Sequence, residues 1–346
     1  MENCTYVGLD LSKTSTMATA VDPQGHRIRQ ARLGVTDEEV IRFLEEIPGP
    51  RLVVMESCNV WEHTYDAAVS TGSEVLLANP FKVRLVSKAT LKTDRVDSEK
   101  LALLARLNAV PEAYAPSVEM RALRRLVRKR IFYHAKWKAV ASHTYSVLLQ
   151  KGIPYRPEIL TRVRLREALR EHRVPEVDRG LDALSKLEEI SRPLDEEIRR
   201  AFSESKEAQL LATIPGVGKF TAVTMVAFLS PIERFDSLDS VVKYCGLCPS
   251  VHQSGEKSYH GRLVWDSNAI LKWVLIEAQW NVRLRERKGD VARTARRVAR
   301  RGGANHGAVA AARKLARICA AILRRGAPYQ PDSPGSSSRR VLSAVS

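Results

Sequence analysis

The apolar positions of the first hundred residues alternate between a strand period and a helix period. Short alternating or continuous apolar runs predict strands in "TYVGLDLS", "TMATAVD", "HRIRQARLGV", "RLVVME" and "EVLLANP". Wider apolar spacing predicts helices in "TDEEVIRFLEEI", with Thr36 as N-cap, in "WEHTYDAAVS" and in "LKTDRVDSEKLALLAR". Strands and helices that alternate in this way predict an α/β domain over residues 1–116.

Three consecutive strands followed by helix, strand, helix, strand and helix is the order of a ribonuclease-H-like fold, which we predict for this first domain. The pattern then changes to nearly continuous helix over 117–210. Within it, "LDALSKLEEISRPLDEEIRRAF" carries apolar residues at three- and four-residue spacing, interrupted by Pro193. This spacing fits a coiled-coil seam or plain packing within a helical hairpin, and plain packing is favoured. The seam would consist of Leu181, Leu184, Leu187, Ile190, Leu194 and Ile198.

A second compact unit is predicted over 211–330. It runs from "LLATIPGVGKFTAVTMVAFL" to the basic helix "NHGAVAAARKLARICAAILRRG", and we expect it to be helical with a helix-hairpin-helix element at its start. The tail 331–346, "PDSPGSSSRRVLSAVS", is predicted to be disordered because proline and serine dominate it. The predicted fold class is therefore α/β plus all-α.

The net charge of the chain indicates which class of partner it binds. It carries 56 Lys and Arg against 39 Asp and Glu, a formal net charge of +17 over 346 residues, which favours a polyanion such as nucleic acid. The stretch from Asn281 to Arg325 holds 14 basic residues against Glu286 and Asp290. A second run, Arg121 to Lys138, has eight basic residues and no acid. Because so few acids are interleaved, phosphate binding is favoured over solvated helix faces.

Cysteine use and hydropathy indicate a reducing compartment and no membrane span. The five cysteines have no framework spacing. The "CGLC" at 245–248 lacks a second Cys or His pair, so we interpret it as a turn with small apolar side chains. The N-terminus shows no signal pattern, and "FTAVTMVAFLSPI" is too short to cross a bilayer. We expect a cytoplasmic protein that does not bind membranes.

Four acids of the first domain are candidates for a metal site. Asp10 ends the first strand and Glu56 ends the fourth, and strand ends are where sites form in α/β sheets. Asp94 and Asp97 are three residues apart, so on a helix they share a face. Four converging carboxylates would repel one another unless a hard cation, Mg²⁺ or Mn²⁺, is bound between them. Each acid alone also has a simpler explanation, as a strand end or as charge at a helix N-terminus.

A glycine-containing turn and one basic helix are candidates for phosphate contact. In "IPGVGKFTA", Gly216 and Gly218 predict a tight turn whose backbone N–H groups point at a phosphate, and Lys219 follows at once. A purely structural turn between two helices is the alternative. In the closing helix, further phosphate contacts are expected from Arg313, Lys314 and Arg317.

The segment "YCGLCPSVHQSGEKSYHGRLV", 244–264, is predicted to be a loop rich in hydroxyls and cations. Ser254 precedes a glycine, which leaves its hydroxyl open to act as a nucleophile that forms a phosphoester. From its residue type alone, a loop serine is more often a hydrogen-bonding turn residue. Lys257 and Arg262 favour phosphate contact over catalysis, as do His252 and His260.

Taken in order, these motifs resemble the DEDD transposases of the insertion-sequence one-ten family. The resemblance covers residues 5–329, and its most specific parts are "KTDRVD" and the "SG" segment downstream of "IPGVG". It implies a RuvC-like catalytic domain in which Asp10, Glu56, Asp94 and Asp97 bind the metal. It also implies that Ser254 attacks a DNA phosphate and forms a 5′-phosphoserine intermediate.

The resemblance further implies donor and target DNA as substrates, a guiding bridge RNA, and assembly as a homodimer or homotetramer. It also implies a bacterial protein that associates with the nucleoid. Four single positions depart from the pattern of the family, namely Ser57, Cys58, Asn59 and Ser98, and past Arg262 the stretch "LVWDSNAILKW" replaces a more basic, glycine-containing pattern. Two other functions stay open at this point. One is a metal-dependent nuclease or Holliday-junction resolvase that uses water in place of the serine, and the other is a nucleic-acid-binding protein without catalytic activity.

Overall fold

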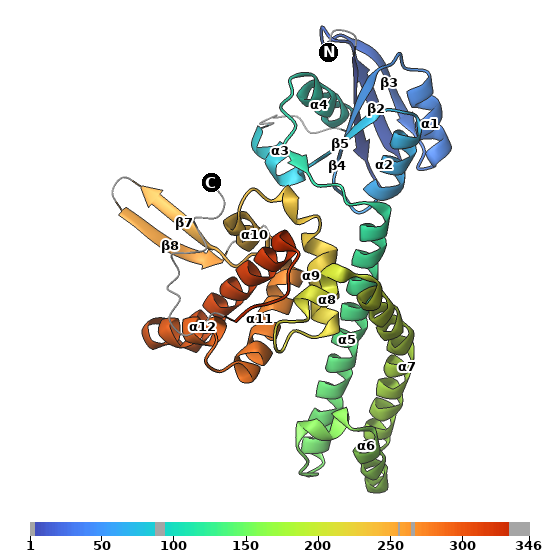
Figure 1. The fold of residues 1–346 in the computed structure, drawn as a ribbon. Coiled ribbons are helices and arrows are strands. Elements are labelled where there is room, and N and C mark those ends of the chain that lie inside the picture. Colours follow the sequence, from blue (N-terminus) through green and yellow to red (C-terminus); the bar gives the residue numbers. More distant parts are fainter. Residues whose placement is uncertain (1–3, 87–93, 255–256, 264–266, 332–346) are drawn as a thin grey trace. The chain divides into compact units, whose positions relative to one another are not determined.

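The computed structural model describes residues 4–86, 94–254, 257–263 and 267–331 (Figure 1). The chain divides into two compact units, Met1–Pro116 and Ser117–Ser346. The first contains a mixed sheet and the second is mostly helical, so the prediction of an α/β part followed by an all-α part is confirmed at this level. No helix within the described ranges combines the length and the apolar composition that a membrane span requires.

The sheet of the first unit has six strands in the order β3-β2-β1-β4-β5-β6. The first three strands pair as an antiparallel meander, β4 and β5 continue the sheet in parallel with β1, and β6 closes it antiparallel to β5. All five predicted strands are present, and the two-residue β6 was not predicted. The strands are β1 Thr5–Leu11, β2 Thr16–Val21, β3 Arg27–Leu33, β4 Arg51–Glu56, β5 Glu74–Ala78 and β6 Glu112–Ala113.

Helices cover both faces of this sheet because its central strands are apolar on both sides. On one face, Leu9 and Met55 join a core with α1 (Asp37–Glu45) and α2 (Trp61–Ser70). On the other face, Tyr6 and Val54 join a separate core with α4 (Asp94–Arg106). Alternate residues of one strand point to opposite faces, so even-numbered residues of β1 and β4 face α4.

A short helix, α3 (Pro80–Val86), precedes α4 and was not predicted. Its start is set by Asn79, whose side-chain oxygen accepts hydrogen bonds from the backbone N–H groups of Phe81 (3.1 Å) and Lys82 (3.2 Å). Asparagine before proline is a helix-start signal that the sequence contained.

The second unit begins with an antiparallel pair of long helices, α5 (Val118–Gln150) and α7 (Pro175–Glu204) (Figure 1). The shorter elements η1 (Pro157–Thr161), α6 (Val163–Leu169) and η2 (Arg170–His172) connect them. The predicted seam is buried at Leu181, Leu184, Leu194 and Ile198, whereas Ile190 is 39% exposed. The expected interruption at Pro193 does not occur, since α7 continues through it.

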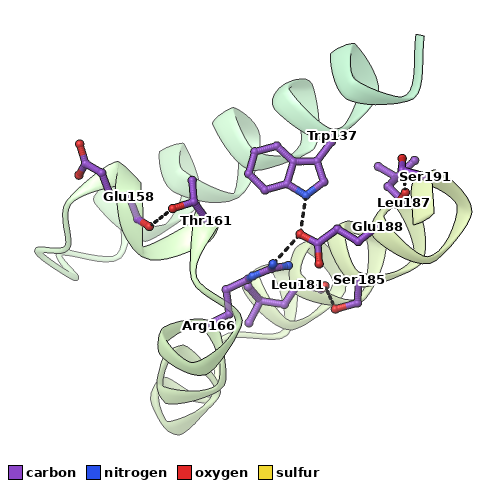
Figure 2. A network of polar contacts seen from close by, with 9 residues as sticks. All are labelled: Trp137, Glu158, Thr161, Arg166, Leu181, Ser185, Leu187, Glu188 and Ser191. Carbon is purple, nitrogen blue, oxygen red and sulfur yellow. Dashed lines mark hydrogen bonds and ion pairs between the residues drawn. The ribbon is translucent and has the colours of Figure 1, made fainter. Parts of the chain in front are cut away.

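A polar network connects the long helices α5 and α7 with the short helix α6 between them in sequence (Figure 2). The carboxylate of Glu188 on α7 accepts a hydrogen bond from Trp137 Nε1 of α5 (2.9 Å) and lies 2.5 Å from Arg166 Nη2 of α6. The side chain of Arg166 is only 3% exposed, so its charge depends on Glu188. One carboxylate therefore holds three helices in register.

The remaining helices pack around α9 (Lys219–Leu229), which is buried from Ala222 to Leu229. Its neighbours are α8 (Lys206–Leu211), α10 (Leu238–Tyr244), α11 (Ala269–Arg285) and α12 (Asp290–Arg325), with the turn η3 (Ile232–Arg234). Two antiparallel strands, β7 (Pro249–Ser254) and β8 (Lys257–Leu263), project from this helical core (Figure 1).

The element α12 consists of two helical arms that meet at Gly303, whose φ of 85° and ψ of 173° are not helical. The arms lie against each other. A Cβ atom on Gly307 would come within 2.7 Å of the carbonyl oxygen of Ala295, and Lys314 Nζ lies 2.9 Å from the carboxylate of Asp290. Because both pairs are centred near residue 302, the arms run antiparallel and form a helical hairpin.

Candidate catalytic site

Asp10 and Glu56 lie side by side at the carboxyl ends of two parallel strands. In the register of β1 and β4, Leu9 is paired with Met55, and the two acids are the next residues along each strand. Neighbouring strands are about 4.8 Å apart, so the two carboxylates start from adjacent backbone positions. Both residues are half-buried and belong to the even-numbered set that faces α4.

The helix α4 crosses that face with its first turn toward the two acids. An added Cβ on Gly8 would lie 2.0 Å from the carbonyl oxygen of Ser98 and 2.6 Å from the backbone nitrogen of Ala102. At the other end of α4, Arg106 Nη1 reaches the carbonyl oxygen of Pro23 (3.5 Å), beyond the far end of the meander. The helix therefore runs antiparallel to β1, and its beginning lies at the Asp10 end.

Asp94 and Asp97 occupy the first turn of α4. Asp97 is 29% exposed, and its carboxylate accepts a hydrogen bond from Lys100 Nζ (2.8 Å). The side chain of Asp94 lies outside the described residues. Among the side chains that the structure describes, no three acids, histidines or cysteines lie close enough to hold a metal ion.

The donor set still fits a hard divalent cation. Carboxylate oxygens are the ligands that Mg²⁺ prefers, and Asp10 and Glu56 supply two from neighbouring strands. The first turn of α4 begins at the same end of the sheet and carries Asp97 and the backbone of Asp94. Lys100 now neutralises Asp97, so a cation would have to displace its ammonium group.

Ser98, one of the four departures from the family pattern, has a structural explanation. Its side chain is fully buried, and its hydroxyl lies 2.8 Å from the hydroxyl of Thr19 on β2. Thr19 also accepts a hydrogen bond from the Gln30 side-chain amide on β3 (2.9 Å). The serine therefore adds a polar contact between α4 and the sheet. Nothing in the structure explains Ser57, Cys58 or Asn59 in the same way.

Ser254 lies at the tip of a β-hairpin, which corrects the prediction of a loop over 244–264. Cα positions pair Ser254 with Lys257 and Gln253 with Ser258, so strands extend up to the residues outside the description, Gly255 and Glu256. A hairpin signal was present in the sequence, since Val251 precedes a Ser-Gly pair and Tyr259 and Leu263 follow it among polar residues. The side chains of Ser254, Lys257 and Arg262 lie outside the described part of the chain, as do His252 and His260.

The "IPGVG" turn connects α8 to α9. Gly216 has a φ of +93°, and an added Cβ would meet the backbone of Asn281 on α11 at 2.6 Å, so this glycine is required by packing. Gly218 is the N-cap residue of α9 and is exposed, with no atom within 4 Å of an added Cβ. Lys219 is exposed as well, with its ammonium group 5.4 Å from the ring of Phe202.

Only some of the basic side chains in the run 121–138 are exposed and able to contact a nucleic acid. On α5, Arg121 and Arg124 are buried, and Arg124 Nε donates to the carbonyl oxygen of Ala227 (2.7 Å). Arg130 pairs with Asp195 (2.6 Å). The interpretation of this run as one phosphate-binding face was therefore wrong for its inward side, because long apolar stems of arginine also serve as packing.

The same distinction holds on α12. Lys314 pairs with Asp290 and Arg317 pairs with Asp239. The side chain of Arg313 has no hydrogen bond or ion pair to the described residues and lines a hollow beside the β7–β8 hairpin. Of the three cations predicted here, only Arg313 is thus uncommitted within the described chain.

The cysteines show no sign of a redox or zinc centre among the described residues. All five are free thiols. Burial raises the pKa of the Cys245 thiol far above its ordinary value and that of Cys319 to about 12. Both therefore stay protonated and act as small apolar side chains.

Sequence reasoning missed Gly8, Thr19 and Lys100. Gly8 carried a signal, since a glycine inside a strand marks close approach of another backbone. Thr19 and Lys100 carried none, because only the folded chain brings Thr19 to Ser98 and Lys100 to Asp97.

Comparison with known proteins adds to this geometry. A family profile described as a transposase, of the DEDD type named after IS110, matches residues 7–152, and the profile "Transposase IS116/IS110/IS902 family" matches 208–295. The transposase of IS1328 from Yersinia enterocolitica is 26% identical over 95% of this chain and 99% of its own length. The transposase of IS1111A from Coxiella burnetii is 24% identical over 95% and 92%. The pilin gene-inverting protein of Moraxella bovis is 24% identical over 59% and 58%.

Proposed function

The chain belongs to the IS110/IS116 family of insertion-sequence transposases, and from that premise we propose a specific chemistry for it. Asp10, Glu56, Asp94 and Asp97 hold divalent metal in a RuvC-like domain, and Ser254 is the nucleophile that attacks DNA. The observation that carries the metal half is the adjacency of Asp10 and Glu56 on parallel strands, beneath a helix that begins with the other two acids.

The finer assignment of the first domain as ribonuclease-H-like rests on its topology. A three-stranded antiparallel meander continued by parallel strands in the order β3-β2-β1-β4-β5 supports it. So does the position of the acids at the carboxyl ends of β1 and β4, where ligands bind in open α/β sheets.

The covalent step is a transesterification. Ser254 Oγ forms a bond to the phosphorus of a DNA phosphodiester, the bond from phosphorus to the 3′-oxygen breaks, and the serine proton ends on that 3′-oxygen. The 5′-phosphate is then esterified to Ser254. Attack by a 3′-hydroxyl on this phosphoserine rejoins a strand and returns the proton to the serine, so the number of phosphoester bonds is conserved.

The acids serve this step by neutralisation of charge. Divalent metal bound to them would supply positive charge to the phosphate oxygens as attack proceeds. The strand register holds Asp10 and Glu56 at adjacent backbone positions. Asp97 has to leave Lys100, and a lysine that competes for the carboxylate makes metal affinity depend on that side chain.

Binding of donor and target DNA, of a guide RNA, and assembly as a homodimer or homotetramer complete the proposal. The clustered basic residues support a nucleic-acid partner, although phosphates carry most of the affinity for DNA and RNA alike. For DNA contact we assign Gly218 and Lys219 at the start of α9, Lys257 and Arg262 on β8, and Arg313 on α12, whereas Gly216, Lys314 and Arg317 hold packing or ion-pair partners in addition.

A suicide DNA substrate tests the proposal. The purified protein with Mg²⁺ should form a covalent protein–DNA adduct, which Ser254→Ala abolishes and the matched hairpin variant Ser258→Ala retains. Asp10→Asn and Glu56→Gln should abolish cleavage while the protein stays folded. An adduct with Ser254→Ala would overturn the serine mechanism, and cleavage that leaves a free 5′-phosphate would favour a nuclease or resolvase that uses water. Binding without any cleavage would leave only the non-catalytic alternative.

A further inference from the structure

The two arms of α12 create an anion-binding hollow at their turn, and we propose that it binds a backbone phosphate of the DNA strand that Ser254 attacks. This inference rests on the proposed function, because it assigns a substrate contact to the same hairpin. The hollow measures about 480 Å³ and is lined by Arg297, Arg301 and His306. A second hollow of about 390 Å³ adjoins it, sharing His306 and adding Arg313.

Most of the α12 cations that lack a hydrogen-bond or ion-pair partner among the described residues lie at these two hollows. Arg293 and Arg296 bond to carbonyl oxygens, Lys314 and Arg317 pair with acids, and Arg324 and Arg325 bond to carbonyl oxygens. Four arginines of this element have no hydrogen bond or ion pair to the described residues: Arg297, Arg300, Arg301 and Arg313. Three of these four line the hollows, and only Arg300 does not.

The backbone adds to this positive field. The second arm begins immediately after Gly303, and Gly302 and His306 line the hollow, so the start of this arm lies beside it; the N-terminal end of a helix favours negative charge. The carbonyl oxygen of Gly302 accepts a hydrogen bond from His306 Nδ1, which leaves Nε2 of that ring for a ligand. Among the described lining residues there is no carboxylate to oppose an anion.

The position of the hollow identifies the ligand as the attacked strand. Pro249 and Leu263 line the second hollow, and they are the outer ends of β7 and β8, so the hollow lies at the root of the hairpin whose tip carries Ser254. Five residue steps at about 3.3 Å each separate root from tip by roughly 17 Å. At about 3.4 Å per nucleotide along one strand, a phosphate bound where the two hollows meet at His306 is then roughly five nucleotides from the scissile one.

A neutral-phosphate scan tests the inference. Single methylphosphonate substitutions, which remove one backbone charge each, are placed along a DNA oligonucleotide on both sides of the cleavage position. Binding is measured by fluorescence anisotropy with Ser254→Ala protein, so that no chemistry intervenes. We expect the substitution about five nucleotides from the cleavage position to weaken binding to this protein. The same substitution should have no further effect once Arg297→Gln and Arg301→Gln are added.

Salt dependence provides the second readout, with Arg300→Gln as the matched control. Loss of this one phosphate contact should reduce the slope of log affinity against log salt by about 1, whereas Arg300→Gln should leave it unchanged. Equal losses from Arg300→Gln, additive losses from the arginine variants and the methylphosphonate, or an effect confined to an RNA oligonucleotide of the same sequence would each overturn the inference. Adduct formation by the protein with Ser254 intact tests the proposed function separately, so the two failures are distinguishable.

Discussion

The contact between Gly8 and α4 links the fold directly to the candidate metal site, and Gly8→Ala tests that link. A Cβ atom at this position would lie 2.0 Å from the carbonyl oxygen of Ser98 and 2.6 Å from the backbone nitrogen of Ala102. Both obstacles are main-chain atoms, so no rotamer change relieves them. Cβ atoms essentially never come closer than 3.0 Å to another atom, so α4 must retreat from β1 by about 1 Å.

Such a retreat has a cost that the structure allows us to bound. It separates the buried residues Leu101 and Ala102 from the sheet and stretches the 2.8 Å contact between Ser98 and Thr19. Overpacking of this kind costs about 1–3 kcal/mol. Because Asp94 and Asp97 move with the helix while Asp10 and Glu56 stay with the strands, metal affinity should fall as well.

The assay combines urea unfolding with Mn²⁺ titration below the unfolding transition. Gly72→Ala is the matched control, because Gly72 has a φ of +74° with no atom within 4 Å of an added Cβ. Its backbone strain should cost about 1–2 kcal/mol without moving α4, so metal binding should persist. If Gly8→Ala unfolds at the same urea concentration as the unmodified protein and binds Mn²⁺ equally well, the packing argument is refuted.

Three further predictions concern the second unit. Arg124→Gln should destabilise this unit by about 1–3 kcal/mol in urea unfolding, because the buried carbonyl oxygen of Ala227 loses its donor. The control Lys129→Gln, at an exposed position, should change stability by less than about 0.5 kcal/mol in the same series. Equal effects of the two substitutions would contradict a packing role for Arg124. Glu188→Ala leaves the buried charge of Arg166 unpaired and should cost about 3 kcal/mol, measured by thermal unfolding, and an unchanged midpoint would rule out the network as a stabilising element. Burial lowers the pKa of His134 in the folded state, and the positive charges of Arg130 and Lys138 lower it further. As pH falls below 6.5, the unfolded chain therefore takes up this proton before the folded chain does, and the folded state should lose stability. The His134→Gln variant should lose less stability between pH 7.5 and 5.5, and identical losses in both proteins would contradict the role of His134.

The sequence predicted the elements of this protein better than their contacts. Five strands and the helices α1, α2 and α4 follow from hydrophobic periodicity, because each central strand and each of these helices buries a continuous face. Asp10 and Glu56 were also predictable as a pair, since parallel strands align their carboxyl ends. The hairpin at Ser254 was missed because its glycines and polar residues masked a short alternation.

The sequence does not show which arginines and lysines are buried in packing contacts and which are open to a partner. Arg124 and Arg313 look alike in a basic run, yet one is buried against a carbonyl oxygen and the other lines a hollow. The sequence predicts that the closing helix begins at Asn305, just after the turn at Gly303, but it contains no sign that the preceding arm packs against this helix. Distinctions of this kind arise only from tertiary packing, which brings residues 290 and 314 together.

The most direct test of the central claim is a crystal structure of the protein grown with Mn²⁺, with anomalous scattering used to locate the metal. The account predicts a peak about 2.0–2.6 Å from carboxylate oxygens of Asp10 and Glu56 and of at least one of Asp94 and Asp97, with Lys100 displaced. A crystal of active protein in which these four carboxylates point apart and no metal lies among them would contradict it.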